Sequence, residues 1–242
     1  MKSGENDRGR RFIVFEGLDG AGKSTQIGLL KQYLEQQNIG LKYLHFPMTD
    51  SPADSPIYGE MVAQFLKGEF GAVNQVNPYL VALLYAGDRN NAKTRIQAWL
   101  EQDNFVLLDR YVYSNMAFQG AKLKTPPEKR NLQEWILRLE YEYHQIPRPT
   151  LSIFLHMNFD FISRKLSDTR EGADRDYLEG KADIHEKSLE LQKQVEREYL
   201  RLVGENDDFH LIDCCAQDGQ TLPPGQIHQK ILRLLSEKKM LF

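Results

Sequence analysis

Five short runs of apolar residues recur along the chain, and each is rich in β-branched or aromatic residues. They cover residues 12–15, 41–46, 105–108, 151–155 and 209–212. Continuous apolar runs of this length are typical of strands that are buried on both faces of a parallel sheet. The pattern therefore predicts a five-stranded parallel sheet.

Between these runs, apolar residues recur every three or four positions, which is the spacing of one face of a helix. The stripes that we expect to face the core are Ile27, Leu30 and Leu34; Leu132, Trp135, Ile136, Leu139 and Tyr143; Ile184, Ser188, Leu191, Val195, Tyr199 and Leu202; and Ile227, Ile231, Leu234 and Leu235. Strands that alternate with helices predict an α/β fold of three layers, with helices on both faces of the sheet. Two turn-rich stretches, residues 49–56 and 125–127, are expected to be loops, and the role of residues 50–77 is open.

The composition is that of a globular protein, with 41% hydrophobic and 27% charged residues among 242. We expect one domain over residues 12–242, preceded by a polar tail at residues 1–11. No apolar run approaches the ~20 residues of a membrane span. The formal net charge of -3 gives no general attraction to a nucleic acid polymer or an anionic membrane.

Only two cysteines occur, Cys214 and Cys215, and adjacent cysteines cannot easily form a disulfide or supply a metal site on their own. A reducing compartment fits this usage, so we expect a soluble cytoplasmic protein.

The most specific motif follows the first predicted strand directly and has the pattern G-x-x-x-x-G-K-[ST] of a P-loop. In such a loop, glycines let several N–H groups converge on a phosphate at the start of a helix. Lys23 is expected to span the β- and γ-phosphates of a nucleotide, and Ser24 to ligate Mg²⁺. The predicted nucleotide-binding residues are Gly17, Gly20, Ala21, Gly22, Lys23, Ser24 and Thr25. A glycine-rich turn that binds nothing is the alternative, but the strand before the loop and the helix after it argue against that.

A second group of polar residues is expected near the same edge of the sheet. Asp109 and Arg110 follow the third predicted strand, and strand ends at this edge face the ligand in α/β folds. Tyr85 and Arg89 are four residues apart, hence on one face of a helix. An aromatic ring and a cation would thus project together.

Together with Phe15-Glu16-Gly17-Leu18-Asp19 and Phe46-Pro47, these segments resemble the thymidylate kinase family, over about residues 12–202. The resemblance implies transfer of the γ-phosphoryl group of ATP to dTMP, which gives dTDP and ADP. It implies a P-loop fold of three α/β/α layers with a small helical lid at about residues 164–180, and Mg²⁺ as the metal. It also implies a homodimer.

The resemblance further assigns roles to residues of the acceptor side. Tyr85 matches a ring that stacks on thymine, Arg89 an arginine that donates to the base carbonyl, and Asn115 a polar position near the base edge. Phe118 matches a ring that crowds the ribose 2'-position, and Gln119 beside it is a further substrate-binding candidate.

On the phosphate side, Asp19 matches the residue that accepts a hydrogen bond from the 3'-hydroxyl, and Arg110 the arginine that bridges the two phosphates. Phe46 and Pro47 match a wall that meets the thymine methyl. Asp109 either holds Mg²⁺ through a water or anchors Arg110.

The lid is expected to supply a catalytic arginine, because the P-loop has Gly20 where other members carry arginine. Arg170 is the first candidate, ahead of Arg164 and Arg175, and a solvated helix face is the alternative. The expected catalytic set is therefore Lys23, Arg110, Arg170 and Asp19.

The sequence departs from the family pattern after the second strand, where many members have Phe-Pro-x-Arg and this chain has Phe46-Pro47-Met48-Thr49. A kinase for another deoxynucleotide or for a deoxynucleoside is therefore an alternative. A protein of another class, which binds ATP without transferring phosphate, is a second alternative. The sequence lacks the N-K-x-D motif of GTPases.

Overall fold

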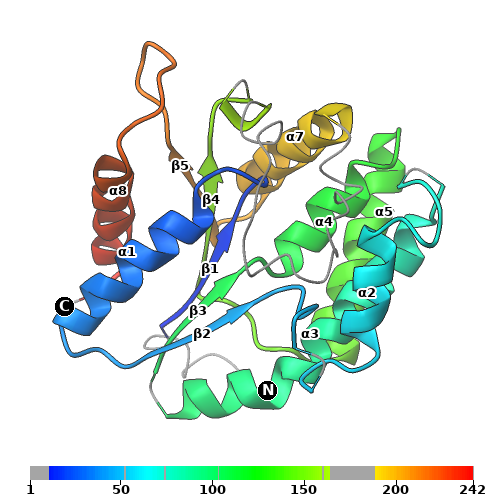
Figure 1. Cartoon of the computed structure of the whole chain (residues 1–242), viewed down its shortest axis with the longest axis horizontal. Coiled ribbons are helices and arrows are strands. Elements are labelled where there is room, and N and C mark those ends of the chain that lie inside the picture. Colours follow the sequence, from blue (N-terminus) through cyan, green and yellow to red (C-terminus); the bar gives the residue numbers. More distant parts are fainter. Residues whose placement is uncertain are drawn as a thin grey trace.

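Parallel strands form the centre of the computed structural model (Figure 1), which describes residues 11–51, 53–73, 75–102, 104–159, 161–163 and 189–241. Within these ranges the sheet has five strands in the order β2-β3-β1-β4-β5. Their bounds are β1 Phe12–Glu16, β2 Leu41–His45, β3 Phe105–Asp109, β4 Leu151–His156 and β5 Phe209–Asp213. The predicted five-stranded parallel sheet is confirmed, and each predicted strand agrees to within one residue at its end.

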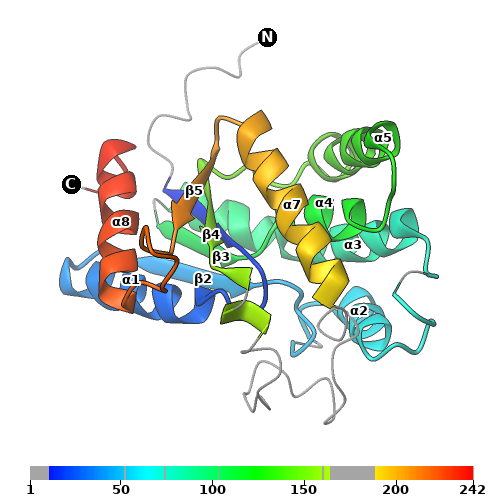
Figure 2. The ribbon, with the colours of Figure 1, turned by 90° about the horizontal axis from the view of Figure 1, so that it is seen from above.

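Helices cover both faces of the sheet, as Figures 1 and 2 show. The bounds are α1 Lys23–Gln36, α2 Tyr58–Leu66, α3 Pro78–Glu101, α4 Val112–Gly120, α5 Pro126–Leu137, the π-helix η1 Arg138–Tyr143, α7 Leu189–Glu205 and α8 Pro224–Glu237. Helices α1 and α8 pack together on one face, whereas α3, α4 and α7 lie on the other. Helix α2 contacts α3, and α5 contacts α4.

The position of β1 determines where a ligand can bind. Every residue of β1 and β3 is buried, because these strands are covered on both faces. β1 pairs with β3 on one side and with β4 on the other, and Phe15 is in register with Asp109. The chain thus changes direction along the sheet beside β1, and ligands of open α/β sheets bind at the carboxyl ends of the strands at such a point.

Most of the predicted apolar stripes are buried in the described helices. They include Ile27, Leu30 and Leu34 of α1, Leu191, Val195, Tyr199 and Leu202 of α7, and Ile227, Ile231 and Leu235 of α8. Leu234 is half-buried. Ile184 and Ser188 lie outside the described residues.

The apolar stripe predicted from Leu132 to Tyr143 is wrong at its last residue. Leu132 and Ile136 are buried as expected, but Tyr143 is 80% exposed. After α5 the chain continues as the π-helix η1, in which the wider turn changes which residues face inward. Glu140 is consequently the residue of η1 that is buried.

Residues 125–127 do not form the loop that the two prolines suggested. Thr125 caps α5, and its side chain and that of Glu128 form a capping box. Pro126 lies in the first turn of the helix, where proline loses no hydrogen bond. The Thr-Pro-Pro sequence therefore starts a helix.

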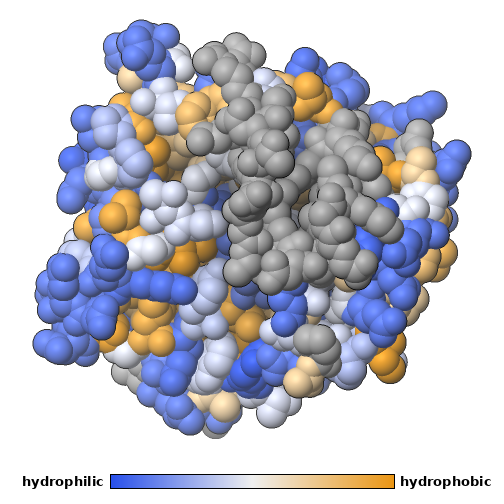
Figure 3. Space-filling view, viewed as in Figure 1, coloured by the Kyte–Doolittle hydropathy of each residue, from blue (hydrophilic) through white to orange (hydrophobic). Residues whose placement is uncertain are grey.

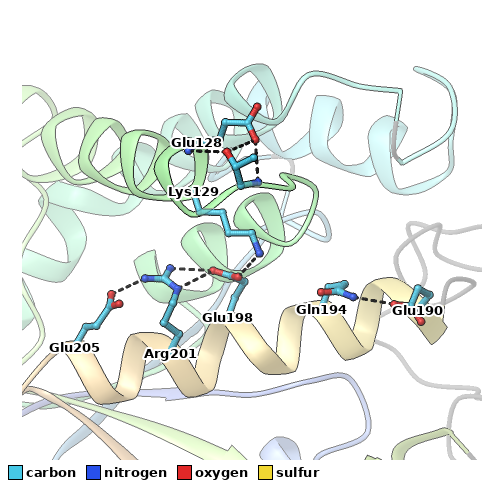
Figure 4. Close-up of polar contacts among 8 residues, drawn as sticks. Glu128, Lys129, Glu190, Gln194, Glu198, Arg201 and Glu205 are labelled. Carbon is cyan, nitrogen blue, oxygen red and sulfur yellow. Dashed lines mark hydrogen bonds and ion pairs between the residues drawn. The ribbon is translucent and has the colours of Figure 1, made fainter.

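Helix α7 is joined to α5 by a cluster of charged side chains (Figure 4). Nζ of Lys129 in α5 lies 2.6 Å from Oε1 of the buried Glu198, and Nη2 of Arg201 lies 2.9 Å from its Oε2. Arg201 also pairs with Glu205 at 2.5 Å. The cluster fixes α7 against α5 next to Tyr199.

The coloured part of the surface in Figure 3 carries hydrophilic and hydrophobic residues side by side. In the described part of the chain, no helix is both long and apolar enough to span a bilayer. Cys214 and Cys215 are both free, as expected.

Candidate active site

The P-loop connects β1 to α1 at the carboxyl edge of the sheet. Gly20 and Gly22 have φ angles of 85° and 82°, a region that residues with a Cβ rarely adopt, and Gly22 is the N-cap of α1. The sequence of the loop therefore produces a tight turn that ends at the N-terminus of a helix. Ser24 and Thr25, in the first turn of α1, are exposed, and an anion can approach this helix end.

Lys23 lies inside the turn. Its Nζ donates hydrogen bonds to the backbone oxygens of Gly17 at 3.2 Å and Leu18 at 3.1 Å. Burial and, after it, the nearby Arg110 cation lower the pKa of Lys23. The ammonium group is thus bound by carbonyl groups of the loop that a phosphate could replace.

Arg110 lies opposite the P-loop, at the end of β3. Its backbone is in the left-handed region, with φ of 66°, which is uncommon for a residue other than glycine. Its Nη2 lies 2.8 Å from Oδ1 of Asp19, and its guanidinium lies over the ring of Phe118 at 5.0 Å. Burial alone lowers the pKa of Arg110, but the carboxylate of Asp19 is the largest of the charges that raise it above its usual value. The structure thus brings together Asp19, Arg110 and Phe118.

A buried carboxylate that was given no role from the sequence supports Arg110. Glu16 accepts hydrogen bonds from the backbone N–H groups of Tyr111 at 2.9 Å and Ser114 at 3.3 Å, which caps the start of α4. It also accepts from the hydroxyls of Ser114 and Tyr199. These hydroxyls lie 3.2 and 3.5 Å from Nη1 of Arg110. Burial raises the pKa of Glu16, and the hydrogen bond from Ser114 is the largest opposing effect.

Asp109 lies at the end of β3, near Lys23. Burial alone raises the pKa of Asp109, but Lys23 and then His45 lower it below its usual value. Its Oδ2 lies 3.5 Å from Nδ1 of His45. Its Oδ1 is buried and has no hydrogen-bond partner in the part of the chain that the structure describes. One carboxylate oxygen is thus free to accept from a bound water.

Arg89 and Asn115 lie together deeper in the site, where both contact Glu140. Nε and Nη2 of Arg89 lie 2.6 and 2.5 Å from the two oxygens of Glu140. Nδ2 of Asn115 donates to Oε1 of Glu140 and to the backbone oxygen of Ala82, each at 3.1 Å. Oδ1 of Asn115 is buried with no partner among the described residues.

Tyr85 is half-buried in α3 beside a separate apolar cluster. The cluster consists of Val62, Phe65 and Leu66 of α2 with Val81 of α3. Helix α2 therefore gives residues 50–77 one structural role, which is to pack against the helix that carries Tyr85 and Arg89.

The segment after β2 leads toward α3. Phe46 is buried and its ring centroid lies 5.8 Å from that of Tyr111, whereas Pro47 is half-buried. The backbone N–H of Met48 donates to Oδ2 of Asp88 at 2.9 Å. Arg95 of α3 lies beside Met48, with Nη2 3.4 Å from its sulfur, but its Nη1 pairs with Asp54 at 2.9 Å.

Gln119 is fully buried in α4, and its Oε1 accepts from Lys122 at 2.7 Å. Among the contacts of the described residues, no hydrogen bond or ion pair joins Gln119 to another predicted site residue, so its role in binding stays a prediction. Arg164, Arg170 and Arg175 lie outside the described residues, as does the predicted lid. The same holds for residues 1–10 of the predicted tail.

Sequence reasoning missed Glu16, Ser114, Tyr199 and Glu140. Glu16 had a visible signal, because it is a charged residue at the end of a strand that is otherwise apolar. Ser114 and Tyr199 were part of recognised segments, but only the fold brings them together. Glu140 had no local signal, because its inward direction depends on η1.

Comparisons with known proteins agree on one family. The family model described as thymidylate kinase matches residues 15–221. A probable thymidylate kinase of Pyrococcus abyssi is 29% identical over 230 residues, which cover 94% of this chain and 96% of that protein. A probable thymidylate kinase of Pyrococcus horikoshii is 32% identical over 205 residues, 84% of this chain and 87% of that protein. The solved structure of thymidylate kinase from Candida albicans is similar to this chain with a TM-score of 0.70 and 22% sequence identity. The match covers 95% of this chain and 93% of that protein, and it shows that the two share a fold.

Proposed function

This chain belongs to the thymidylate kinase family, and from that premise we propose that it transfers the γ-phosphoryl group of ATP to the phosphate of dTMP. In this reaction, the bond between the γ-phosphorus and its bridging oxygen to the β-phosphate breaks. A new bond forms from the γ-phosphorus to an oxygen of the dTMP phosphate, and ADP leaves. The observation that carries the choice of base is the arrangement of Arg89 and Asn115 on Glu140.

ATP would bind at the P-loop, through the seven nucleotide-binding residues predicted between Gly17 and Thr25. Nζ of Lys23 would exchange the carbonyl oxygens of Gly17 and Leu18 for oxygens of the β- and γ-phosphates. The N–H groups at the start of α1 would donate to the same phosphates, and the helix dipole favours the negative charge there.

The thymine ring would bind beside Tyr85, with Arg89 and Asn115 at its edge. One end of the Asn115 amide contacts two acceptors, the backbone oxygen of Ala82 and Oε1 of Glu140, so this end must be the donor nitrogen Nδ2. The other end, Oδ1, is left as an acceptor for the base. Glu140 binds Nε and Nη2 of Arg89, which leaves the N–H groups of Nη1 for another acceptor. Thymine has an N3–H donor next to an O4 acceptor and complements this pair, whereas cytosine has the opposite polarity at both positions.

Other parts of the nucleotide would contact residues nearer the P-loop. Asp19 is the proposed acceptor for the 3'-hydroxyl, and Phe118 would lie against the ribose 2'-position. Phe46 and Pro47 would meet the thymine methyl group. Arg110, held between Asp19 and Ser114, is placed to bridge the two phosphates with its fork of donors.

Mg²⁺ fits the residues present at the donor side. Oδ1 of Asp109 is a buried acceptor without a partner among the described residues, and Ser24 is exposed at the start of α1. Hydroxyl, carboxylate and phosphate oxygens are the hard ligands that Mg²⁺ prefers, with several waters retained. We therefore propose that Ser24 holds the ion directly and Asp109 through a water; when bound, the ion compensates phosphate charge.

The acceptor is a phosphate oxygen that is already ionised near neutral pH, so the protein needs no general base. Catalysis then consists of alignment and charge compensation. Lys23 and Arg110 supply two of the cations, and Arg170, the first lid candidate, is proposed as a third.

A second copy of the chain is the proposed partner, as the resemblance implies. Leu80 and Leu83, one helical turn apart on α3, are 60% and 39% exposed, and Ile57 just before α2 is 65% exposed. Exposed apolar side chains one turn apart on the same helix favour an interface.

A coupled assay of ADP release tests the reaction class. With ATP and Mg²⁺ present, we expect release with dTMP and none with thymidine, which lacks the phosphate acceptor. Release with thymidine but not with dTMP would make the protein a nucleoside kinase, and binding of ATP without release on any of dTMP, dUMP, dCMP or dGMP would make it a binding protein.

A further inference from the structure

A single carboxylate connects the two groups that face the base. Glu140 is completely buried, and the three described hydrogen bonds of its carboxylate all come from Arg89 and Asn115. Its Oε1 accepts from both residues, so the guanidinium and the amide lie side by side on one atom. The orientation of both base-facing groups therefore depends on the position of Glu140.

The contacts of Glu140 fix orientation more than they stabilise the fold. A buried ion pair gains little net stability, because the loss of hydration of both charges offsets their attraction. Arg89 is only 2% exposed, so bulk water could replace the two Glu140 oxygens at its Nε and Nη2 only poorly. Burial alone lowers the pKa of Arg89, but the charge of Glu140 more than compensates and raises it. The pair thus keeps Arg89 charged while adding no net charge beside a neutral base.

The local structure also turns Glu140 inward. In a continuous α-helix, the apolar stripe of α5 would bring Leu139 and Tyr143 to the core, but in η1 Glu140 is buried and Tyr143 is exposed. π-Helical turns are rare and occur often at functional sites. Here the turn delivers a carboxylate to Arg89 of α3 and Asn115 of α4.

We infer that Glu140 is the positioning residue that sets the base specificity of the acceptor site, by holding Arg89 Nη1 and Asn115 Oδ1 in the arrangement that matches thymine. This inference rests on the proposed function. Without the carboxylate, Arg89 would lose its acceptor, and Asn115 Nδ2 would keep only the backbone oxygen of Ala82. The Asn115 amide could then rotate and offer a donor where thymine has N3–H.

The test compares Glu140→Gln with Glu142→Gln, an exposed glutamate of the same π-helical segment. Glutamine has the same shape but one acceptor oxygen, so it cannot serve both Nε and Nη2 of Arg89. We expect Glu140→Gln to raise the KM for dTMP by about tenfold or more, to change kcat by less than about threefold and to leave the KM for ATP unchanged. The reason is that Arg89 and Asn115 would bind the base equally in the ground state and the transition state, so weakening those contacts changes binding more than turnover. The ratio of kcat/KM for dTMP over dCMP should fall with it, and Glu142→Gln should match the wild type.

A purely structural role predicts a different result. Glu140→Gln would then lower the melting temperature and leave the ratio of dTMP to dCMP at its wild-type value, and that outcome overturns the inference. The wild-type protein in the same assay separates the two proposals: if it phosphorylates no deoxynucleotide, the proposed function itself fails and the inference with it.

A second pair of variants applies if Glu140→Gln does not fold. Arg89→Gln with Glu140→Gln removes both buried charges, and Arg89→Gln alone is its reference. Because Asn115 also depends on Glu140, we expect the double variant to discriminate dTMP from dCMP less well than Arg89→Gln does. Equal discrimination by the two variants would overturn the inference.

Discussion

Two cations, Lys23 at the start of α1 and Arg110 directly after β3, face the place where phosphoryl transfer is proposed. Lys23 is bound by carbonyl groups of its own loop, and Arg110 is held by Asp19, Ser114 and Tyr199. The left-handed backbone of Arg110 directs its side chain back toward the P-loop, and unusual backbone conformations of this kind cluster at functional sites. Both side chains are therefore oriented before any substrate binds.

Removing either cation should slow the reaction without unfolding the protein. We expect Lys23→Ala and Arg110→Ala each to lower kcat by ~10² or more, because a fixed charge is lost where negative charge is transferred. Lys31→Ala is the matched control for Lys23, since Lys31 lies two turns along α1 with its Nζ over the ring of Tyr43. Steady-state kinetics and circular dichroism check this, and near-normal turnover in either variant would contradict the mechanism.

At the scale of single residues, the sequence predicted the site where a local motif carries the information. The P-loop spacing and the Asp109-Arg110 pair at a strand end are of this kind. Glu16, Ser114 and Tyr199 come from three distant segments and meet only when β1, α4 and α7 pack together. Their mutual contacts could not be predicted from any one of those segments.

Helix α7 links the proposed active site to two other elements. Tyr199 contacts Glu16 and Arg110, Glu198 contacts Lys129 of α5, and Glu196 contacts His156 of β4. These three side chains thus anchor α7 to the elements around it. Movements of α7 would be transmitted to Arg110 through Tyr199.

The contact between His156 and Glu196 gives α7 a stability that depends on pH. The hydrogen bond that His156 donates to the Glu196 carboxylate raises the pKa of His156 above its ordinary value of 6.5, and partial burial opposes this. A raised folded pKa stabilises the folded state fully below the unfolded value, and this contribution is lost as the pH rises through the folded value. Glu196→Gln should therefore lower the free energy of unfolding at about pH 5.5 by up to ~1 kcal/mol and have little effect at about pH 8.5.

Urea unfolding at the two pH values measures this difference. Glu190→Gln in the first turn of α7 is the control, because Glu190 accepts only from Gln194 of the same helix among the described contacts. A loss of the same size at both pH values would show that His156 does not titrate against Glu196.

At the scale of elements, the sequence predicted strands better than helix ends. The three central strands β1, β3 and β4 are buried almost throughout, and burial on both faces leaves little choice of structure, whereas the edge strands β2 and β5 are only partly buried. The phase of η1 and the capped start of α5 were predicted wrongly. The π-helical turn has no signature in the apolar spacing, and Thr125-Pro126-Pro127 fits both a turn and a capped helix start.

For the whole molecule, the proposed dimer places α3 in two roles. One side of this helix carries Tyr85 and Arg89 toward the acceptor site, and Leu80 and Leu83 are exposed. Leu80→Glu should shift the protein from dimer to monomer in sedimentation equilibrium, because a charge would be buried in an apolar contact. Arg130→Glu, an exposed site on α5, is the control, and a wild-type monomer would contradict the proposal.

The account depends most on the match between the base and the pair formed by Arg89 and Asn115. The direct measurement is kcat/KM for dTMP and dCMP with the wild-type protein under identical conditions. A site that hydrogen-bonds its substrate should reject the base of opposite polarity strongly, so we predict a preference for dTMP of ~10² or more. Equal efficiency with the two nucleotides, or a preference for dCMP, would contradict the account.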